Sequence, residues 1–113
     1  MISKSNRLNR SEINNIKQFP LKYRDGGMLV LYQKNRLTYS KVAVVVSKKI
    51  HRKAVQRNYL KRIVMGTISQ QLKKHPSLSF SLIFYPSKIY TQLSLQNKAK
   101  IMSNIFEYLC KKI

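Results

Sequence analysis

Acidic residues are nearly absent from this sequence. Its 113 residues include only three, Glu12, Asp25 and Glu107, and these lie far apart along the chain. Hydrolysis of a phosphodiester by protein-bound metal ions needs carboxylates that converge on the ions. Three scattered carboxyl groups therefore argue against a nuclease that carries its own catalytic metal site, and we expect no catalytic residue in the protein.

Metal-binding and redox residues are also scarce. Cys110 is the single cysteine, so the chain has no disulfide framework, and its place in a helical pattern indicates a buried thiol. His51 and His75 are isolated, and one cysteine with two histidines at irregular spacing does not make a zinc site. The glycine motifs that cradle nucleotide phosphates are missing as well. We expect no metal and no cofactor bound by the protein alone.

Long apolar runs are missing too. The longest uninterrupted stretches are about five residues, Met28–Tyr32 and Val42–Val46, whereas a membrane-spanning helix needs about twenty. The basic N-terminus is not followed by the apolar core of a secretory signal. The sequence predicts a soluble, cytoplasmic protein with no membrane partner.

Positive charge is what the chain has in excess. Its 23 Lys and Arg residues give a formal net charge of +20, and such self-repulsion destabilises a compact state unless a polyanion is bound. The densest stretch is residues 48–62, in which seven of fifteen residues are Lys or Arg and none is acidic. A charge run is often only a solvated face, but this one directly follows an apolar run, so a strand leads into a basic helix. That pattern favours binding to a phosphate backbone.

The hydrophobic pattern predicts a single α+β domain. Residues 1–10 are expected to form a flexible basic N-terminus and residues 11–113 the domain. Asp25-Gly26-Gly27 is a turn signal, and the Val run indicates a strand buried on both faces. The expected elements are a helix capped by Ser11 and ending near Phe19 and Pro20, strands at 28–33, 39–47 and 80–85, a short strand before Tyr39, and helices at 53–72 and 95–112. The last helix carries an apolar stripe that is expected to pack in the core, with a partner-binding face as the lesser option: Ala99, Met102, Ile105, Phe106 and Leu109.

The predicted helix at 53–72 has two different sides. At 100° per residue, one side is polar and the other is apolar. The polar side holds Lys53, Arg57, Asn58, Lys61 and Arg62. The apolar side holds Tyr59, Leu60, Ile63 and Val64. The helix N-terminus adds backbone N–H donors and the positive end of the helix dipole. The amide of Asn58 can contact a base edge or a 2′-OH, which a lysine cannot do in the same way.

Aromatic residues on the strands suggest where single-stranded nucleic acid could stack. Tyr32, Tyr39, Phe84 and Tyr85 lie on or beside predicted strands, and exposed aromatics on a sheet bind unpaired bases. We favour Tyr32, which shares a face of its strand with Met28 and Val30. The sequence does not tell which face of the sheet is open.

Taken together, these segments resemble the protein component of bacterial ribonuclease P over almost the whole chain. The strongest match is the strand end at residues 44–49, VVVSKK, followed by Ala54 and by RNYLKR at residues 57–62, which is similar to the family's RNR helix. The resemblance implies the fold of the second domain of ribosomal protein S5, with order α-β-β-β-α-β-α and a left-handed βαβ crossover. It also implies a subunit that supports 5′ maturation of precursor tRNA, the active site being carried by the ribonuclease P RNA and Mg²⁺ being needed by the RNA-containing holoenzyme.

The same resemblance assigns roles to residues. The expected RNA-binding residues on the RNR helix and the preceding strand end are Lys48, Lys49, Arg52, Lys53, Arg57, Asn58, Lys61 and Arg62. The candidates for a cleft that contacts the 5′ leader are Ile13, Lys17, Tyr32 and Lys41. There are departures from the family pattern: Tyr59 replaces the usual third Arg, Met65 and Gly66 replace Arg and Glu, and Ile13 and Lys17 stand where aromatics are frequent.

Two other functions remain open at this stage. A structural RNA-binding protein, such as a ribosomal protein with no role in cleavage, has a similar composition, and only the motif spacing argues against it. A duplex-DNA binder that places the basic helix in a major groove is disfavoured, because an apolar strand precedes that helix in place of the short helix-turn-helix spacing. We therefore expect the ribonuclease P RNA and precursor tRNA as partners, and no DNA.

Overall fold

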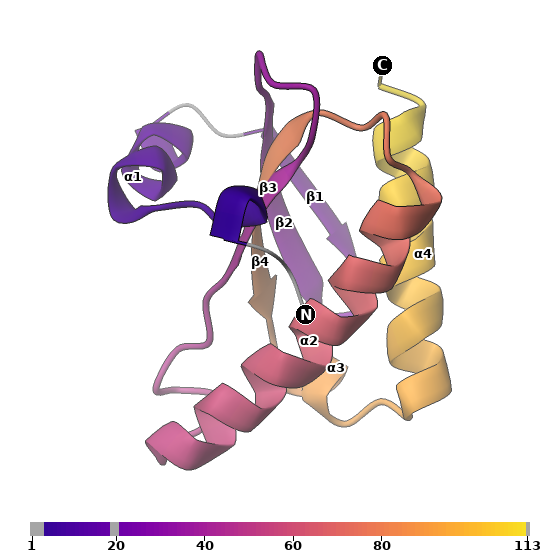
Figure 1. Cartoon of the computed structure of the whole chain (residues 1–113). Coiled ribbons are helices and arrows are strands. Elements are labelled where there is room, and N and C mark those ends of the chain that lie inside the picture. The colour runs from indigo at the N-terminus through magenta and orange to yellow at the C-terminus, as the bar shows by residue number, and fades with distance from the viewer. Residues whose placement is uncertain (1–3, 19–20, 113) are drawn as a thin grey trace.

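The computed structural model describes residues 4–18 and 21–112 (Figure 1). Its helices are the 3-10 helix η1 (Lys4–Asn6) and the α-helices α1 (Arg10–Gln18), α2 (Ala54–Lys74), α3 (Lys88–Thr91) and α4 (Leu95–Cys110). Its strands are β1 (Leu21–Asp25), β2 (Met28–Lys34), β3 (Lys41–Val44) and β4 (Phe80–Pro86). This order confirms the predicted α+β class, to which η1 and α3 add two short helices.

The four strands form one sheet in the order β1-β2-β4-β3. The pairs β1–β2 and β2–β4 are antiparallel, and β3 runs parallel to β4, so α2 makes a crossover between two adjacent parallel strands. The left hand of this crossover stays an inference from the family resemblance. The predicted strand at 39–47 is shorter than expected, since pairing begins only at Lys41.

One strand lies at a different place from the predicted one. The sequence suggests a short strand just before Tyr39, whereas the structure has β1, which precedes the Asp25-Gly26-Gly27 turn. Gly26 and Gly27 have φ angles of 56° and 84°, the conformation that a tight two-residue hairpin turn requires. The sequence of β1, LKYRD, alternates Leu21 and Tyr23 with charged residues, but two apolar residues are too short a pattern to stand out as a strand. The strand lies at the sheet edge with Lys22 and Arg24 exposed.

The opposite sheet edge is covered by the N-terminal segment. Arg7 pairs with Val42 in a parallel bridge, and the Leu8 N–H donates to the Val42 carbonyl at 3.0 Å. Covering an edge strand in this way prevents its pairing with another chain. Residues 1–3 lie outside the described part of the chain, and the flexibility of residues 1–10 stays a prediction, but Arg7 and Leu8 lie directly against β3.

Helices cover both faces of the sheet and produce two apolar clusters. Strand residues alternate between faces, so Val30, Leu82 and Phe84 pack with α2 and α4, whereas Leu31 and Ile83 pack on the side of α1. Most of the Val run is buried as predicted, because both layers cover β3: the exposed fractions are 1% for Val42, 9% for Ala43, 8% for Val44 and 7% for Val46. Val45, on the α1 side, is only half-buried.

Helix α1 starts two residues earlier than the sequence suggested. Asn9, rather than Ser11, caps it: the Glu12 N–H donates to Asn9 Oδ1 at 2.8 Å, and the Asn9 N–H donates to Glu12 Oε1 at 3.0 Å. This reciprocal pair is a capping box, and it places Ser11 inside the helix. The predicted helix end at Phe19 and Pro20 lies outside the described residues.

The C-terminal helix confirms the predicted apolar stripe. Met102, Ile105, Phe106 and Leu109 of α4 are each 0% exposed, and Ser94 caps its start by accepting a hydrogen bond from the Asn97 N–H at 3.2 Å. None of the helices within residues 4–18 and 21–112 has the length and hydropathy that crossing a bilayer requires.

Candidate nucleic-acid interface

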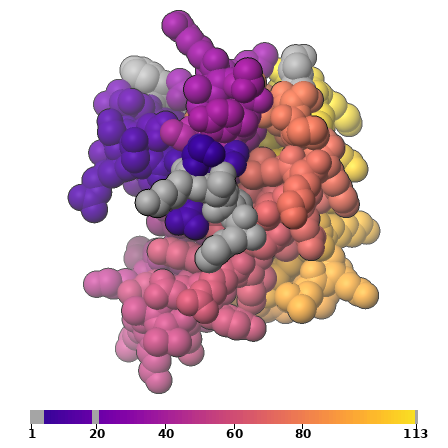
Figure 2. Space-filling view, viewed as in Figure 1, coloured from indigo at the N-terminus to yellow at the C-terminus, as the bar shows by residue number. Residues whose placement is uncertain are grey.

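The basic segment, residues 48–62, consists of the last part of the loop after β3 and the first turns of α2. It projects from the lower left of the molecule in the view of Figure 2. The four loop cations, Lys48, Lys49, Arg52 and Lys53, are all exposed. Chain continuity therefore gathers the predicted RNA-binding residues on one projecting surface.

Arg57 joins the loop to the helix. Its guanidinium donates through Nη1 to the His51 carbonyl at 3.0 Å and to the Arg52 carbonyl at 2.7 Å. These bonds fix the loop at a helix start where Lys53 provides no side-chain cap. The remaining N–H groups of the guanidinium can still meet a phosphate, so Arg57 combines a positioning role with charge.

Most of the predicted division of α2 into two sides is confirmed. Leu60 and Val64 are buried, at 3% and 0% exposure, while Asn58 and Arg62 are exposed and Lys61 is half-buried. Tyr59 was placed on the apolar side, and that prediction is wrong because its side chain is 65% exposed. The physical reason is that the first turns of α2 extend past the end of the sheet (Figure 1).

The cations of the basic segment are not neutralised within the described residues. The one ion pair found there joins Lys41 to Glu12, outside the segment. Seven Lys and Arg side chains of residues 48–62 thus repel one another with no acidic partner. A polyanion laid along this surface removes that repulsion and releases counterions.

A second candidate surface lies on the α1 side of the sheet. Ile13, Leu29, Val45 and Tyr85 are half-buried around the smaller apolar cluster, and Lys17 is exposed at the last turn of α1. A pocket of about 350 Å³ at one end of this surface includes Leu29 and Tyr85 in its lining. Burial raises the pKa of the Tyr85 hydroxyl above its ordinary value of 10.0.

Tyr32 does not belong to this surface, and its assignment to a leader cleft is corrected. The side chain is 5% exposed and faces α4, where its hydroxyl lies 3.0 Å from that of Tyr108. Its ring meets Phe80 edge-on with centroids 6.1 Å apart. The Tyr108 hydrogen bond and burial raise the pKa of Tyr32 to about 12. An unpaired base cannot reach this ring, and Tyr85 is the half-exposed strand aromatic on the α1 side.

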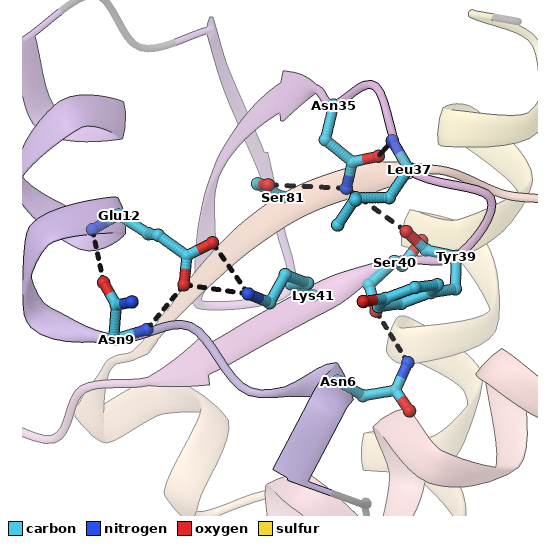
Figure 3. A network of polar contacts seen from close by, with 9 residues as sticks. All are labelled: Asn6, Asn9, Glu12, Asn35, Leu37, Tyr39, Ser40, Lys41 and Ser81. Atoms are coloured by element: carbon cyan, nitrogen blue, oxygen red, sulfur yellow. Dashed lines mark hydrogen bonds and ion pairs between the residues drawn. The ribbon is translucent and has the colours of Figure 1, made fainter.

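Lys41 is on the α1 side but is engaged by a carboxylate. Its Nζ donates to Glu12 Oε2 at 2.8 Å and to Oε1 at 2.9 Å (Figure 3). The hydrogen bond from Lys41, with the bond from the Asn9 N–H, holds the pKa of Glu12 below its usual value of 4.5. One of the three acids of the chain therefore fixes α1 to β3, and Lys41 is not an independent cation at the surface.

We expect Glu12→Gln to lower the free energy of unfolding at pH 7 by about 0.5–1 kcal/mol, because the ion pair is partly exposed to solvent. Gln can still accept the Asn9 N–H, so the change isolates the charge. The Glu12 pKa is lower in the folded than in the unfolded state, so this stability is complete above the unfolded value and is lost as the pH falls through the folded one. Urea unfolding of the wild type and of Glu12→Gln at several pH values measures the difference in their free energies of unfolding. A difference that does not shrink as the pH is lowered through the carboxyl range would contradict the ion-pair explanation.

In residues 4–18 and 21–112, no three His, Cys, Asp or Glu side chains come close enough to hold an ion together. Asp25 lies at the β1–β2 turn and Glu107 near the end of α4, so the acids remain separated in space as they are in sequence.

Comparison with protein families and curated proteins gives a consistent result. The family model for ribonuclease P matches residues 2–110. A protein from Coxiella burnetii named ribonuclease P protein component is 31% identical over 84 residues, which cover 62% of this chain and 69% of that protein. One of the same name from Chromohalobacter salexigens is 40% identical over 57 residues, which cover 50% of this chain and 44% of that protein.

Solved structures match the fold. The RNase P protein from Thermotoga maritima is 22% identical and superposes with a TM-score of 0.73, covering 90% of this chain and 96% of that chain. The RNase P protein from Staphylococcus aureus is 16% identical, with a TM-score of 0.74 and coverage of 93% and 95%. At these identities the likeness establishes the arrangement of helices and strands.

Proposed function

The chain belongs to the bacterial ribonuclease P protein component family, and we propose from this that it binds the catalytic ribonuclease P RNA through the basic segment. The observation that carries the proposal is the set of seven Lys and Arg residues within 48–62, with no acidic residue between them and no acidic partner among the described residues, at the spacing of the family's RNR helix. The protein then serves the endonuclease by binding and orienting RNA, with no catalytic residue of its own.

The basic segment can contact RNA in two ways. Lys48, Lys49, Arg52 and Lys53 lie on an exposed loop that Arg57 holds at the helix start, and flexible cations of this kind follow a phosphate backbone. On the helix itself, Lys61 and Arg62 supply charge while Asn58 supplies an amide that both donates and accepts. Contacts to a 2′-OH through such an amide distinguish RNA from DNA.

The α1 side of the sheet is the proposed contact for the 5′ leader of precursor tRNA. Ile13, Leu29 and Val45 make its apolar floor, and Tyr85 offers a half-exposed ring on which a leader base stacks. Lys17 lies at its border as a phosphate contact. Burial argues against Tyr32 in this role, and the ion pair with Glu12 argues against Lys41. A leader bound here and an RNA bound at the basic segment would together favour precursor over mature tRNA.

Mg²⁺ belongs to the RNA-containing holoenzyme in this proposal. The described residues bring no set of carboxylates or imidazoles together, so they do not fit a catalytic magnesium site, and no step through a metal is derived for the protein. What the protein contributes is positive charge, which replaces part of the magnesium that folded RNA otherwise needs.

Cleavage of precursor tRNA at low magnesium tests the proposal. A bacterial ribonuclease P RNA is incubated with the substrate with and without this protein. We expect cleavage to be restored when the protein is added and to be absent with the protein alone. Substrates with and without a leader, compared by binding to the assembled complex, report on the α1 side.

The rival function is a structural RNA-binding protein without a role in cleavage. It predicts tight RNA binding but no restoration of cleavage with any of several bacterial ribonuclease P RNAs. That outcome would overturn the proposed function, and using RNAs from more than one source guards against a mismatched pair.

A further inference from the structure

A second pocket, of about 330 Å³, lies on the side of α2 that faces away from Lys61. It is bordered by the first half of α2 and by the chain at α3 and the start of α4. Val55, Tyr59 and Ile63 form its apolar wall, and Lys98 closes it from α4. The RNA-binding role given above to the basic face makes no use of this pocket.

Lys98 is the unusual residue of the pocket. The 7% exposure shows that its aliphatic stem is covered, whereas its ammonium reaches solvent at the mouth of the pocket, since it is not one of the buried side-chain atoms that lack a hydrogen bond. No ion pair joins this ammonium to another side chain among residues 4–18 and 21–112. Its place in the first turn of α4, at the positive end of the helix dipole, is unfavourable for a cation. An anion in the pocket would relieve this repulsion.

The apolar wall is equally unusual. Val55 is 79% exposed and Tyr59 is 65% exposed, so two large side chains of the helix stand uncovered beside an unpaired ammonium. A ligand with a flat ring and an anionic group would cover the apolar wall with its ring and neutralise the ammonium, since bases stack on aromatic side chains. The volume is at the lower end of the range for small-molecule pockets, about 300–1,000 Å³, which suits a single nucleotide and excludes a duplex.

We propose that this pocket holds one unpaired nucleotide of the bound RNA, with its base on Tyr59 and its phosphate beside Lys98. The inference rests on the proposed function, because it takes RNA as the polyanion. It gives a reason for tyrosine at the third position of the RNR motif: the basic side of α2 follows the RNA backbone, while the Tyr59 side captures a base. His51, which also borders the pocket, can supply a further hydrogen bond to the phosphate.

Two matched pairs of variants of the full chain test the proposal by affinity for a bacterial ribonuclease P RNA at one fixed salt concentration. Lys98→Met is compared with Lys100→Met, an exposed lysine of the same helix, so that both lose one charge. Tyr59→Ala is compared with Tyr59→Phe, which keeps the ring. We expect Lys98→Met to weaken binding about tenfold relative to Lys100→Met, and Tyr59→Ala about tenfold relative to Tyr59→Phe.

Two additional readouts separate binding from folding. Lys98→Met should leave the melting temperature of the free protein nearly unchanged, because Met keeps most of the packed aliphatic stem and removes only an ammonium that has no ion-pair partner. The Lys98→Met/Tyr59→Ala double variant should lose less affinity than the product of the single losses, because both residues hold the same nucleotide. In nucleotide-resolution footprinting, each variant should expose the same short unpaired RNA segment.

The possible outcomes are distinct. If the wild-type protein does not bind the RNA, both the proposed function and the pocket assignment fail. If it binds, and both test variants equal their controls, only the pocket assignment is overturned. If inorganic phosphate raises the melting temperature of the wild type but not of Lys98→Met, while RNA affinity is equal in the two, the pocket is a simple anion site and the nucleotide assignment is wrong.

Discussion

Replacing Lys61 and Arg62 together by glutamine is expected to weaken binding to ribonuclease P RNA about a hundredfold. Each cation on the basic side of α2 can make one charged hydrogen bond to a phosphate, worth about 1.5 kcal/mol or more, and each 1.4 kcal/mol is about a tenfold change in affinity. The slope of log affinity against log salt should also fall by about 0.7–0.9 for each lost contact. Filter binding at several salt concentrations measures both quantities.

The matched control lies on the same helix. Lys73 and Lys74 are exposed in the last turn of α2, so Lys73→Gln/Lys74→Gln removes the same charge at the far end. We expect this control to change affinity by only a few-fold, through long-range attraction that salt screens. Equal losses in the two double variants would mean that net charge, and not the RNR face, governs binding. Leu60 and Val64 hold the helix on the sheet, so neither variant should alter folding much.

Tyr32→Ala should destabilise the protein by about 3–5 kcal/mol, which is typical of removing a buried aromatic ring. The ring fills the space between β2, β4 and α4, with Phe80 and Tyr108 against it. Because typical domains are stable by only about 5–15 kcal/mol, much of the molecule would be unfolded at moderate temperature. Urea unfolding in the presence of sulfate, which screens the charge, gives the free energy.

Two controls separate this effect from leader binding. Tyr32→Phe removes only the hydroxyl that contacts Tyr108 and should cost about 0.5–1.5 kcal/mol. Tyr85→Ala, on the α1 side, should reduce binding of precursor tRNA while leaving mature tRNA unaffected. If Tyr32→Phe instead impairs precursor binding selectively at unchanged stability, then Tyr32 is not buried when the protein is bound in its complex.

Burial along the chain was predictable where the pattern is long and regular. The Val run before the basic segment and the stripe of Met102, Ile105 and Phe106 were both predicted, because sequence period reports which residues share a side and apolar sides become buried. The charge of residues 48–62 was equally visible, since charged side chains without acidic neighbours must face solvent or a ligand. These two features fix the core and the main candidate surface.

Other features depend on contacts between distant segments. Period two places Tyr32 and Tyr85 on defined sides of their strands but does not say which side faces α1, and the choice made from the sequence was wrong. Lys41 is 29 residues from Glu12, and no local pattern indicates their ion pair. Tyr59 has the spacing of a core residue, yet the first turns of α2 extend past the sheet, so nothing in the described part of the chain covers it.

The edge position of β1 has a consequence for the protein before it meets RNA. Among the described residues no strand pairs with the outer edge of β1, whereas Arg7 and Leu8 cover the opposite edge, and an unpaired strand edge invites pairing with a second molecule. Two copies that approach through β1 would bring Lys22 and Arg24 of each against those of the other, on molecules of net charge +20. Concentrated salt shortens the range of this repulsion to about 3 Å at 1 M. The cations that attract the RNA thus also keep copies of the free protein apart. The free protein should therefore remain monomeric in dilute salt and self-associate as the salt concentration rises.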